Sequence, residues 1–382
     1  MFRNARINAL LWQAVFIGGV IAVAVWLVGN TLDNLAKLNV KSGFAFLRDT
    51  AGFDFSPSFI PFDPTSTYFD ALVAATVNTL VAAAITCVLT TILGFLIGIA
   101  RLSRNWLLAR MAMIYVETLR NIPLLLQLVF WYFAVLAALP KAQQSLTFWG
   151  FGYLNVRGLF LPAASAPSGG GAVLGAVALS LAVWFLVARR ATARRVASGH
   201  EVVYRRYLLP GLAVFILAVA VLTGFSLELE YPELKRTNFV GGIAVTPEFF
   251  ALIVGLTLYH SALTAEVVRS GIQSVGHGQR EAALALGLRP GQIMRKVIMP
   301  QALWVITPQL TSNYLSITKD TSLAAAIAFP ELVTVMTGPV LIQSGQSIEV
   351  IAIVMAVYLV ISLSISAFMN WYDRRKSRTE LR

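Results

Sequence analysis

Hydrophobic residues fill this chain in long blocks, and polar residues gather in the segments between them. Eight blocks are apolar enough to cross roughly 30 Å of hydrocarbon, which takes about 20 helical residues at about 1.5 Å each. The pattern therefore predicts an all-α polytopic membrane protein with about eight transmembrane helices. The expected spans are 10–29, 71–100, 111–139, 172–188, 208–226, 247–268, 303–328 and 348–371.

One loop between spans departs from this pattern. Residues 283–288 place apolar side chains at helical spacing within a basic segment, where a membrane protein has little reason to hide apolar surface. Gly287 is well placed to end a short helix in a left-handed conformation, and Pro290 to open a second helix at its first turn. Residues 276–300, called the knob below, are therefore predicted to form a stiff helix-turn-helix that fits a socket on another protein.

Composition supports a membrane protein. The 382 residues are 57% hydrophobic and only 13% charged, with a mean hydropathy of +0.73, which excludes an ordinary soluble protein. The first span is too long for a signal-peptide core and is expected to remain as an anchor. Cys87 is the only cysteine, so no disulfide within the chain and no cysteine-based metal site is expected.

The basic residues that give the net charge of +12 lie mainly in alternate loops, on one side of the predicted membrane spans, and do not form one basic patch. Alternate loops carry 21 basic residues, and the opposite loops carry 7. This positive-inside bias predicts that both termini face the cytosol and that the number of crossings is even. The basic balance is thus a topology signal, and no nucleic-acid partner is expected.

Catalytic and cofactor motifs are absent from the sequence. No Gly-x-x-x-x-Gly-Lys-[Ser/Thr] loop is present to cradle the phosphates of ATP. His200, His260 and His277 are dispersed, without the spacing of metal ligands. We therefore expect neither an enzyme nor a metal or cofactor site in this chain.

Polar residues inside spans are costly and tend to be functional. In the third span, Glu117 and Arg120 are one helical turn apart and are expected to form a structural ion pair. Pro123 frees helix carbonyl groups and predicts a kink. Asn121 and Gln127 are the better candidates for lining a pore or a substrate path.

Glu266 and Arg269 form a second polar group, at the point where the sixth span meets the knob. They are also one helical turn apart. A lone ionised residue would be costly there, so we expect an ion pair that braces the knob against the span.

A third group lies in the seventh span and contains Asn313, Lys319, Asp320, Thr321 and Ser322. Lys319 and Asp320 are adjacent, so they point to different faces of a helix. The ammonium and carboxylate groups of an amino acid would be suitable counter-charges, which makes the group a candidate substrate lining. Interhelical salt bridges that hold the core remain an equal alternative.

Four motifs resemble the permeases of ATP-binding-cassette (ABC) importers. Glu281-Ala282-Ala283, then Gly287, then Val297, Met299 and Pro300 resemble the EAA loop of these proteins. The other three motifs, Arg120–Gln127, Glu266–Ile272 and Lys319–Leu323, are similar to those of polar-amino-acid permeases. The length and extra spans resemble the general L-amino-acid type within this binding-protein-dependent family.

The resemblance implies a type I importer core of five helices, extended by one leading helix and an inserted hairpin. Residues 1–70 would then form an anchor helix and a periplasmic segment. Residues 71–371 would form the transmembrane domain, with the hairpin 172–226 inserted. Residues 372–382 would form a basic cytoplasmic tail, and the protein would lie in a bacterial inner membrane.

The resemblance also implies partners and a mechanism. A second homologous permease would share the pore, a periplasmic protein would deliver L-amino acids, and two cytosolic ABC ATPase subunits would bind ATP and Mg. Transport would proceed by alternating access, with Glu281, Ala282, Ala283, Gly287 and Pro300 in the ATPase-coupling loop. The rival is a gradient-driven transporter or channel without an ATPase, but the paired repeats with broken helices in corresponding positions that are typical of that class are not visible in the sequence.

Overall fold

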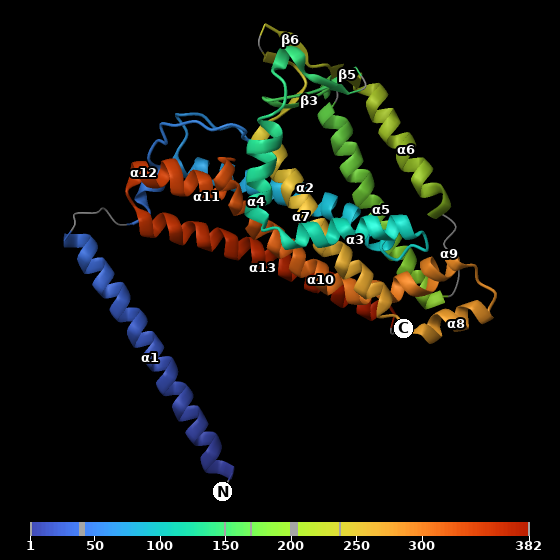
Figure 1. The fold of residues 1–382 in the computed structure, drawn as a ribbon, viewed down its shortest axis with the longest axis horizontal. Helices are drawn as coiled ribbons and strands as arrows, with labels where there is room; N and C mark the ends of the chain where they lie inside the picture. The colour runs from blue at the N-terminus through green and yellow to red at the C-terminus, as the bar shows by residue number, and fades with distance from the viewer. Residues whose placement is uncertain are drawn as a thin grey trace. The chain divides into compact units, whose positions relative to one another are not determined.

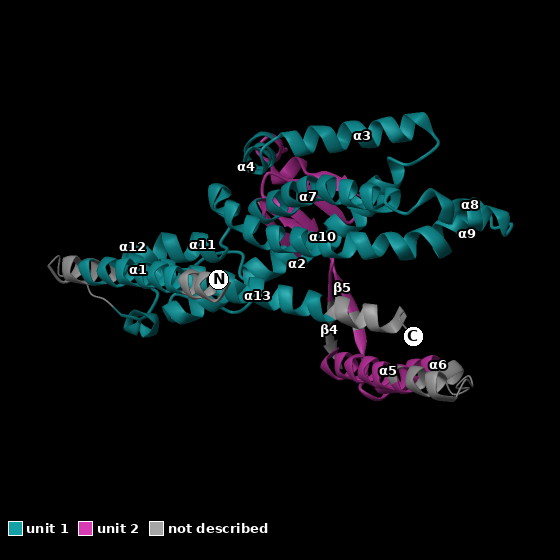
Figure 2. Cartoon of the chain, turned by 90° about the horizontal axis from the view of Figure 1, so that it is seen from below, with its two compact units in different colours: residues 1–134, 248–382 teal, residues 135–247 magenta. Residues whose placement is uncertain are grey.

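A computed structural model describes residues 2–37, 43–148, 150–168, 170–198, 205–236 and 238–380. The chain divides into two units, which Figure 2 colours separately: residues 1–134 with 248–382, and residues 135–247. Figure 1 labels the helices and some of the strands.

The first unit is built from helices. They are α1 (Phe2–Lys37), α2 (Tyr68–Ala100), α3 (Trp106–Asn121), α4 (Leu124–Val129), α7 (Pro247–Gln273), α8 (His277–Ala285), α9 (Pro290–Ile293), α10 (Met299–Asp320), α11 (Leu332–Val335), α12 (Leu341–Ser344) and α13 (Ser347–Glu380). Short 3-10 helices cover Ala45–Arg48 and Thr321–Ile327, and π-helical turns cover Phe130–Leu136, Met294–Ile298 and Met336–Val340.

The third expected span, 111–139, is not one straight helix. The chain instead forms α3 and then α4 with its π-helical continuation, and the two parts meet at an angle of 104°. Pro123 lies at the break and serves as the N-cap of α4 with extended backbone, because proline cannot donate a hydrogen bond within a helix. The sequence predicted a kink here but not one of this size.

The seventh expected span, 303–328, belongs to a longer broken helix. The chain is helical over Pro290–Ile327, turns at Ala328 in a left-handed conformation, and resumes over Leu332–Ser344 at an angle of 48°. Residues 330–346, expected to connect two spans, are therefore mostly helical. Glu331 starts the second part as the N-cap of α11.

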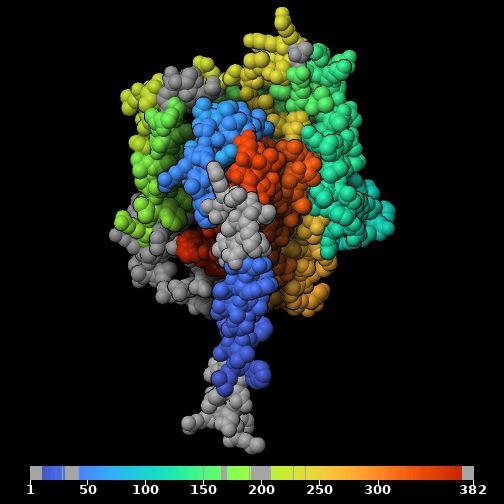
Figure 3. Space-filling model, turned by 90° about the vertical axis from the view of Figure 1, so that its left-hand side faces the viewer, coloured from blue at the N-terminus to red at the C-terminus, as the bar shows by residue number. Residues whose placement is uncertain are grey.

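The segment before α2 packs onto this second part. Phe46 and Tyr68 are buried in one cluster with Leu332, Met336 and Val340. Figure 3 shows the segment in light blue beside the orange-red residues of α11 and α12. Part of residues 43–67, expected outside the membrane, thus covers the apolar surface of the broken helix.

The second unit contains a helical hairpin and short strands. The hairpin pairs α5 (Gly170–Ser198) with α6 (Arg205–Leu222). The strands are β1 (Leu146–Phe148), β2 (Gly152–Asn155), β3 (Gly158–Leu161), β4 (Ala163–Ser168), β5 (Ser226–Glu230), β6 (Glu233–Lys235), β7 (Asn238–Val240) and β8 (Ile243–Val245). They form an antiparallel sheet of order β1-β2-β3-β8 and two two-stranded pairs, β4-β5 and β6-β7.

The expectation of an all-α protein is therefore wrong for residues 146–168 and 226–245. Strands of three to six residues are too short to show an alternating pattern in the sequence. Phe160 of β3 and Phe239 of β7 are buried together, with ring centroids 4.9 Å apart.

The prediction of a mostly helical polytopic protein is confirmed. Among the described residues, four helices are long and apolar enough to cross a membrane, and six spans result if each bent pair counts as one. Two further apolar helices, Leu11–Leu27 and Leu208–Leu222, are shorter. They coincide with the expected first and fifth spans.

Candidate functional site

The knob has the predicted local structure. Helix α8 ends at Ala285, and Gly287 follows with a φ of +73°. The Gly287 amide donates to the carbonyl of Leu284 at 2.9 Å, and the Leu288 amide donates to that of Ala283 at 3.2 Å. These two bonds close a helix end that requires a left-handed residue, which glycine adopts without strain. Both predictions, that Gly287 ends the first helix and that Pro290 opens the second, are confirmed.

The inner face of the knob is anchored in the helical core. Ala283, Ile293 and Ile298 are buried in one cluster with Val268 and Ile272 of α7 and with Ala302, Ile306 and Leu310 of α10. The outer face carries Glu281, Ala282 and Leu286, all of them exposed. Leu286 is 80% exposed, which leaves apolar surface at the tip.

The second helix of the knob continues into the core. It runs from Pro290 through the π-helical turn Met294–Ile298 into α10. Pro300 is the second residue of α10, just after this turn, and because a proline cannot donate to the carbonyl four residues earlier, the wider turn accommodates it. A movement of the knob would therefore be transmitted along one helix to Asp320.

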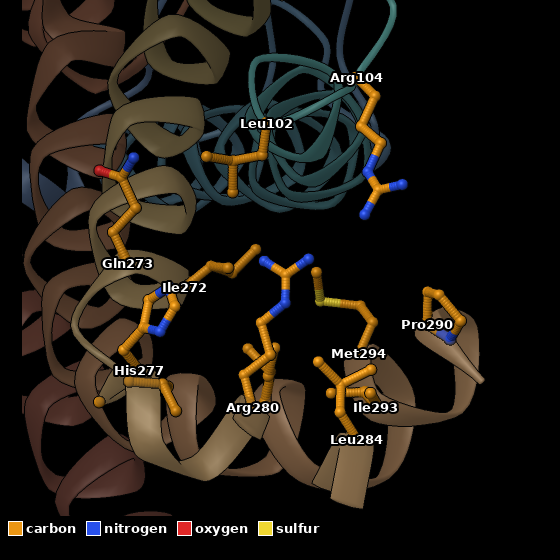
Figure 4. Close-up of a pocket in the computed structure, with 13 residues that line it drawn as sticks. Leu102, Arg104, Ile272, Gln273, His277, Arg280, Leu284, Pro290, Ile293 and Met294 are labelled. Carbon is orange, nitrogen blue, oxygen red and sulfur yellow. The ribbon is translucent and has the colours of Figure 1, made fainter. Parts of the chain in front are cut away.

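A cavity of about 480 Å³ separates the knob from the loop that follows α2. Figure 4 shows Arg280 of the knob and Arg104 of that loop pointing into it from opposite walls, and Leu102, Ile293 and Met294 supply apolar lining. No acidic residue belongs to the lining of this cavity. The charged side chains of this lining, Arg104 and Arg280, are thus both basic.

Charged residues at the ends of three helices form one cluster. Glu266 of α7 bonds both to Arg269, one turn later, and to Arg101, which ends α2. Glu117 of α3 lies 3.7 Å from Arg101. Within the described part of the chain, no ion pair joins Glu117 to Arg120. The predicted Glu266–Arg269 pair is present in the structure, whereas Glu117 takes Arg101 as its partner.

Arg101 was not singled out in the sequence. It follows the end of the expected span 71–100, as Glu266 lies near the end of the expected span 247–268, which was the available signal. The distance in sequence between the two residues hid their pairing.

Gln127 braces the bend between α3 and α4. Its side chain is buried, and its Nε2 donates to the carbonyls of Leu119 at 2.9 Å and Ile122 at 3.0 Å. The break at Pro123 leaves these carbonyls without helical partners, so the glutamine replaces the lost backbone donors. Asn121, the other candidate lining residue of this segment, is exposed.

The polar group of α10 is divided between buried and accessible side chains. Asn313 and Thr321 are buried, Lys319 is exposed, and Asp320 and Ser322 are partly exposed. Asp320 bonds to His260 of α7, a fully buried residue, with 3.1 Å between Oδ2 and Nε2. His260 also bonds to Asn313, so this histidine joins two of the predicted residues.

His260 was noted in the sequence only as one of three dispersed histidines. The missed signal was its position in the middle of an apolar span, where a polar residue needs a partner. Among the described residues, no group of three or more His, Cys, Asp or Glu could hold a metal ion.

A second buried polar site lies where α11 begins. The Glu331 carboxylate accepts hydrogen bonds from the amides of Val333 and Thr334 and from the hydroxyl of Tyr358. Asn78 of α2 donates to the carbonyl of Pro330 at 2.8 Å. These bonds fix the break in the helix, and neither Glu331 nor Asn78 was predicted from the sequence.

Comparisons with known proteins agree with this architecture. The family model described as "Binding-protein-dependent transport system inner membrane component" matches residues 202–378. The chain is 42% identical to the putative amino-acid ABC transporter permease protein YhdX of Escherichia coli K12, over 98% of this chain and 95% of that protein. It is 43% identical to the general L-amino acid transport system permease protein AapQ of Rhizobium johnstonii, over 99% and 96% of the two chains.

A third relative extends the comparison. The chain is 36% identical to the glutamate/glutamine/aspartate/asparagine transport system permease protein BztB of Rhodobacter capsulatus, over 97% of this chain and 94% of that protein. Because such similarity covers nearly the whole length, the chain belongs to the family of binding-protein-dependent transport system inner membrane components.

Proposed function

We propose that this chain is the permease subunit of an ATP-driven importer that moves L-amino acids across the bacterial inner membrane by alternating access. One observation carries the mechanism. The knob and the polar group around Asp320 lie at the two ends of one continuous helix, Pro290–Asp320. A force applied to the knob is therefore delivered to the residues proposed to meet the substrate.

The exposed face of the knob fits the site at which an ATPase would push. Glu281, Ala282 and Leu286 face outward, while Ala283 holds the knob to the core. A helix end closed by Gly287 resists bending, so a push by the ATPase moves the whole knob instead of only deforming the loop. ATP and Mg belong to the separate ATPase, and this chain supplies no catalytic group.

The contacts that join the knob, α2, α7 and α10 suggest how the core moves. Glu266 links α7 to α2 through Arg101, and the knob packs on α7 and α10 through one apolar cluster. These helices are expected to rock together as the knob moves, which opens and closes a path that contains Lys319 and Asp320. Discrete packing arrangements of this kind convert a local push into a change of access.

The proposed assembly contains a second, homologous permease, two cytosolic ABC ATPase subunits and a periplasmic amino-acid-binding protein. Amino acids are the proposed substrates because the relatives that match nearly the full length are named for amino-acid transport. General L-amino-acid transport follows from the similarity to AapQ.

We also propose eight crossings, with both termini in the cytosol. The two shorter apolar helices, Leu11–Leu27 and Leu208–Leu222, would add two spans to the six candidate spans and give eight. The proposed division keeps 1–70 as anchor and periplasmic segment, 71–371 as transmembrane domain with the hairpin 172–226 inserted, and 372–382 as tail. The 21-to-7 asymmetry of basic residues supports this orientation.

Reconstituted vesicles distinguish this function from gradient-driven transport. The complex that co-purifies with this chain is placed in vesicles with radiolabelled amino acid and binding protein outside, and with ATP or a non-hydrolysable analogue inside. We expect uptake only with hydrolysable ATP, and no effect of a protonophore or sodium ionophore. Uptake that follows an imposed ion gradient without ATP would favour the secondary transporter.

A further inference from the structure

His260 of α7 meets a hydrogen-bond acceptor at each of its two ring nitrogens. Nδ1 lies 2.7 Å from Oδ1 of Asn313, and Nε2 lies 3.1 Å from Oδ2 of Asp320. The imidazole is fully buried, whereas the Asp320 side chain is 33% exposed. The histidine therefore holds an accessible carboxylate from inside the core.

The orientation of Asn313 follows from its other contacts. Its Nδ2 donates to Oγ1 of Thr264 at 2.7 Å and points to the carbonyl oxygen of His260 at 3.4 Å. A carbonyl oxygen can only accept, so the amide nitrogen faces these two groups and Oδ1 faces the imidazole. Nδ1 of His260 must then carry a hydrogen.

Nε2 faces a carboxylate, which also only accepts while it is ionised. A neutral histidine with its hydrogen on Nδ1 would present a lone pair to the oxygens of Asp320 and repel them. The observed contact thus requires one further proton between Nε2 and Oδ2. Among the described residues, the titratable groups in contact with the imidazole are Asp320 on α10 and Tyr259 on α7, whose ring packs edge-on at 5.2 Å. Lys319, the adjacent charge on α10, is exposed.

We propose that His260 is a positioning residue for transport: with its shared proton it fixes the orientation and charge of Asp320 where α10 ends. The inference rests on the proposed function, because it assigns Asp320 to the substrate path.

Two isosteric replacements separate the two contacts of the histidine. In His260→Gln the amide nitrogen lies near the position of Nε2 and donates to Asp320. In His260→Asn the amide lies near the position of Nδ1 and meets only Asn313. We expect the Gln variant to retain maximal uptake within about twofold and the Asn variant to lose about tenfold, the size of one charge-assisted hydrogen bond.

Thermal stability of both complexes is recorded alongside uptake, so that a loss of folding is separated from a loss of the contact with Asp320. Retained uptake in the Asn variant with loss in the Gln variant would overturn the proposal, since the contact with Asn313 would then be the important one. Equal uptake in both variants would overturn it as well.

Should both variants fail to assemble, Asp320→Asn decides the question. Its amide keeps a hydrogen bond with Nε2 of His260 but removes the charge that the histidine is proposed to hold, so uptake should fall about tenfold while the complex still assembles. Wild-type uptake in that variant would overturn the proposal. Failure of the proposed function looks different, because the wild-type complex would then show no ATP-dependent uptake.

Discussion

Gly98 of α2 lies so close to Ala265 of α7 that a Cβ atom built on the glycine would come within 2.7 Å of the alanine carbonyl oxygen. Gly94, one turn earlier, would meet Cβ of Thr264 at 2.5 Å. Glycines four residues apart let two membrane helices approach closely. This contact fixes α7, which carries both His260 and Glu266.

We expect Gly98→Ala to lower the stability of the purified protein. The added methyl group meets backbone, which cannot rotate away, so α2 and α7 must separate at a cost of about 1–3 kcal/mol. Thermal unfolding in detergent, followed by tryptophan fluorescence, measures the shift.

Gly175→Ala in α5 is the matched control, because nothing lies within 4 Å of the added atom. Replacing an open helical glycine by alanine should stabilise by about 0.4–1 kcal/mol. Opposite signs for the two variants are therefore expected. A similar shift for both would show that the α2–α7 contact is not tight.

Gly287→Val should abolish uptake and the co-purification of the ATPase while the protein remains in the membrane. Nothing crowds the added side chain, so the whole effect comes from the backbone at position 287, where φ is +73°. A branched residue disfavours this conformation by about 1–2 kcal/mol, and the end of α8 would rearrange. Pull-down of the ATPase and vesicle uptake measure the result.

Gly278→Val controls for added bulk in the same loop. Gly278 lies in α8, has open space around its Cβ position and does not have a positive φ. We expect nearly normal ATPase binding in this variant. Normal binding in Gly287→Val as well would remove the case for a rigid docking knob.

The parts of the site that could be predicted depend on local chemistry. Gly287 and Pro290 act within a few residues of themselves, so their roles were readable without the fold. The Glu266–Arg269 pair is one helical turn long and was predictable for the same reason. The partners of Glu117 and Asp320 lie on other helices, and only packing decides that these are Arg101 and His260.

In the fold, too, local features could be predicted and contacts between distant residues could not. Apolar length predicted where helices lie, because every backbone group must be satisfied within a span. It could not predict the 104° break at Pro123, since proline permits a bend but Gln127 fixes it. Two of the strand pairings, β3-β8 and β4-β5, join segments that are distant in the sequence, and the strands have only three to six residues, so they leave little trace in the sequence.

Glu331→Ala should destabilise the break between α10 and α11. The buried carboxylate accepts from two backbone amides and the Tyr358 hydroxyl, and each buried group left unpaired costs about 1–3 kcal/mol. Glu331→Gln keeps one acceptor oxygen and should lose less. Thermal unfolding of the three proteins checks the order, and equal loss in both variants would show that capping is not the role of Glu331.

Cysteine labelling checks the proposed topology. With Cys87 replaced by alanine, Val196→Cys and Asn238→Cys should label from opposite sides of the membrane, the first from the cytosol. The expectation rests on the basic residues that flank position 196. Labelling of both positions in intact cells by one impermeant maleimide would contradict the eight-span proposal.

Lys319→Met should change which amino acids are carried without lowering stability. Lys319 is exposed, and no ion pair within 4.0 Å involves it in the described part of the chain. Its charge is therefore available to a substrate carboxylate rather than used to hold helices together. We expect weaker uptake of acidic amino acids relative to basic ones, measured by competition in vesicles, with an unchanged unfolding temperature.

Asp63→Asn is the control for removing a charge outside the spans. Hydrogen bonds from the side chain and backbone of Thr65 hold the pKa of Asp63 below its usual value of 3.8, so this carboxylate is ionised throughout a neutral or alkaline assay. Its depressed pKa can affect stability only as pH falls through the acidic range. Neutralising Asp63 should thus leave uptake and selectivity unchanged at neutral pH.

If Lys319→Met lowered the unfolding temperature and left the selectivity of transport unchanged, Lys319 would brace the core in the assembled complex. If it behaved like Asp63→Asn in every measurement, neither role would stand.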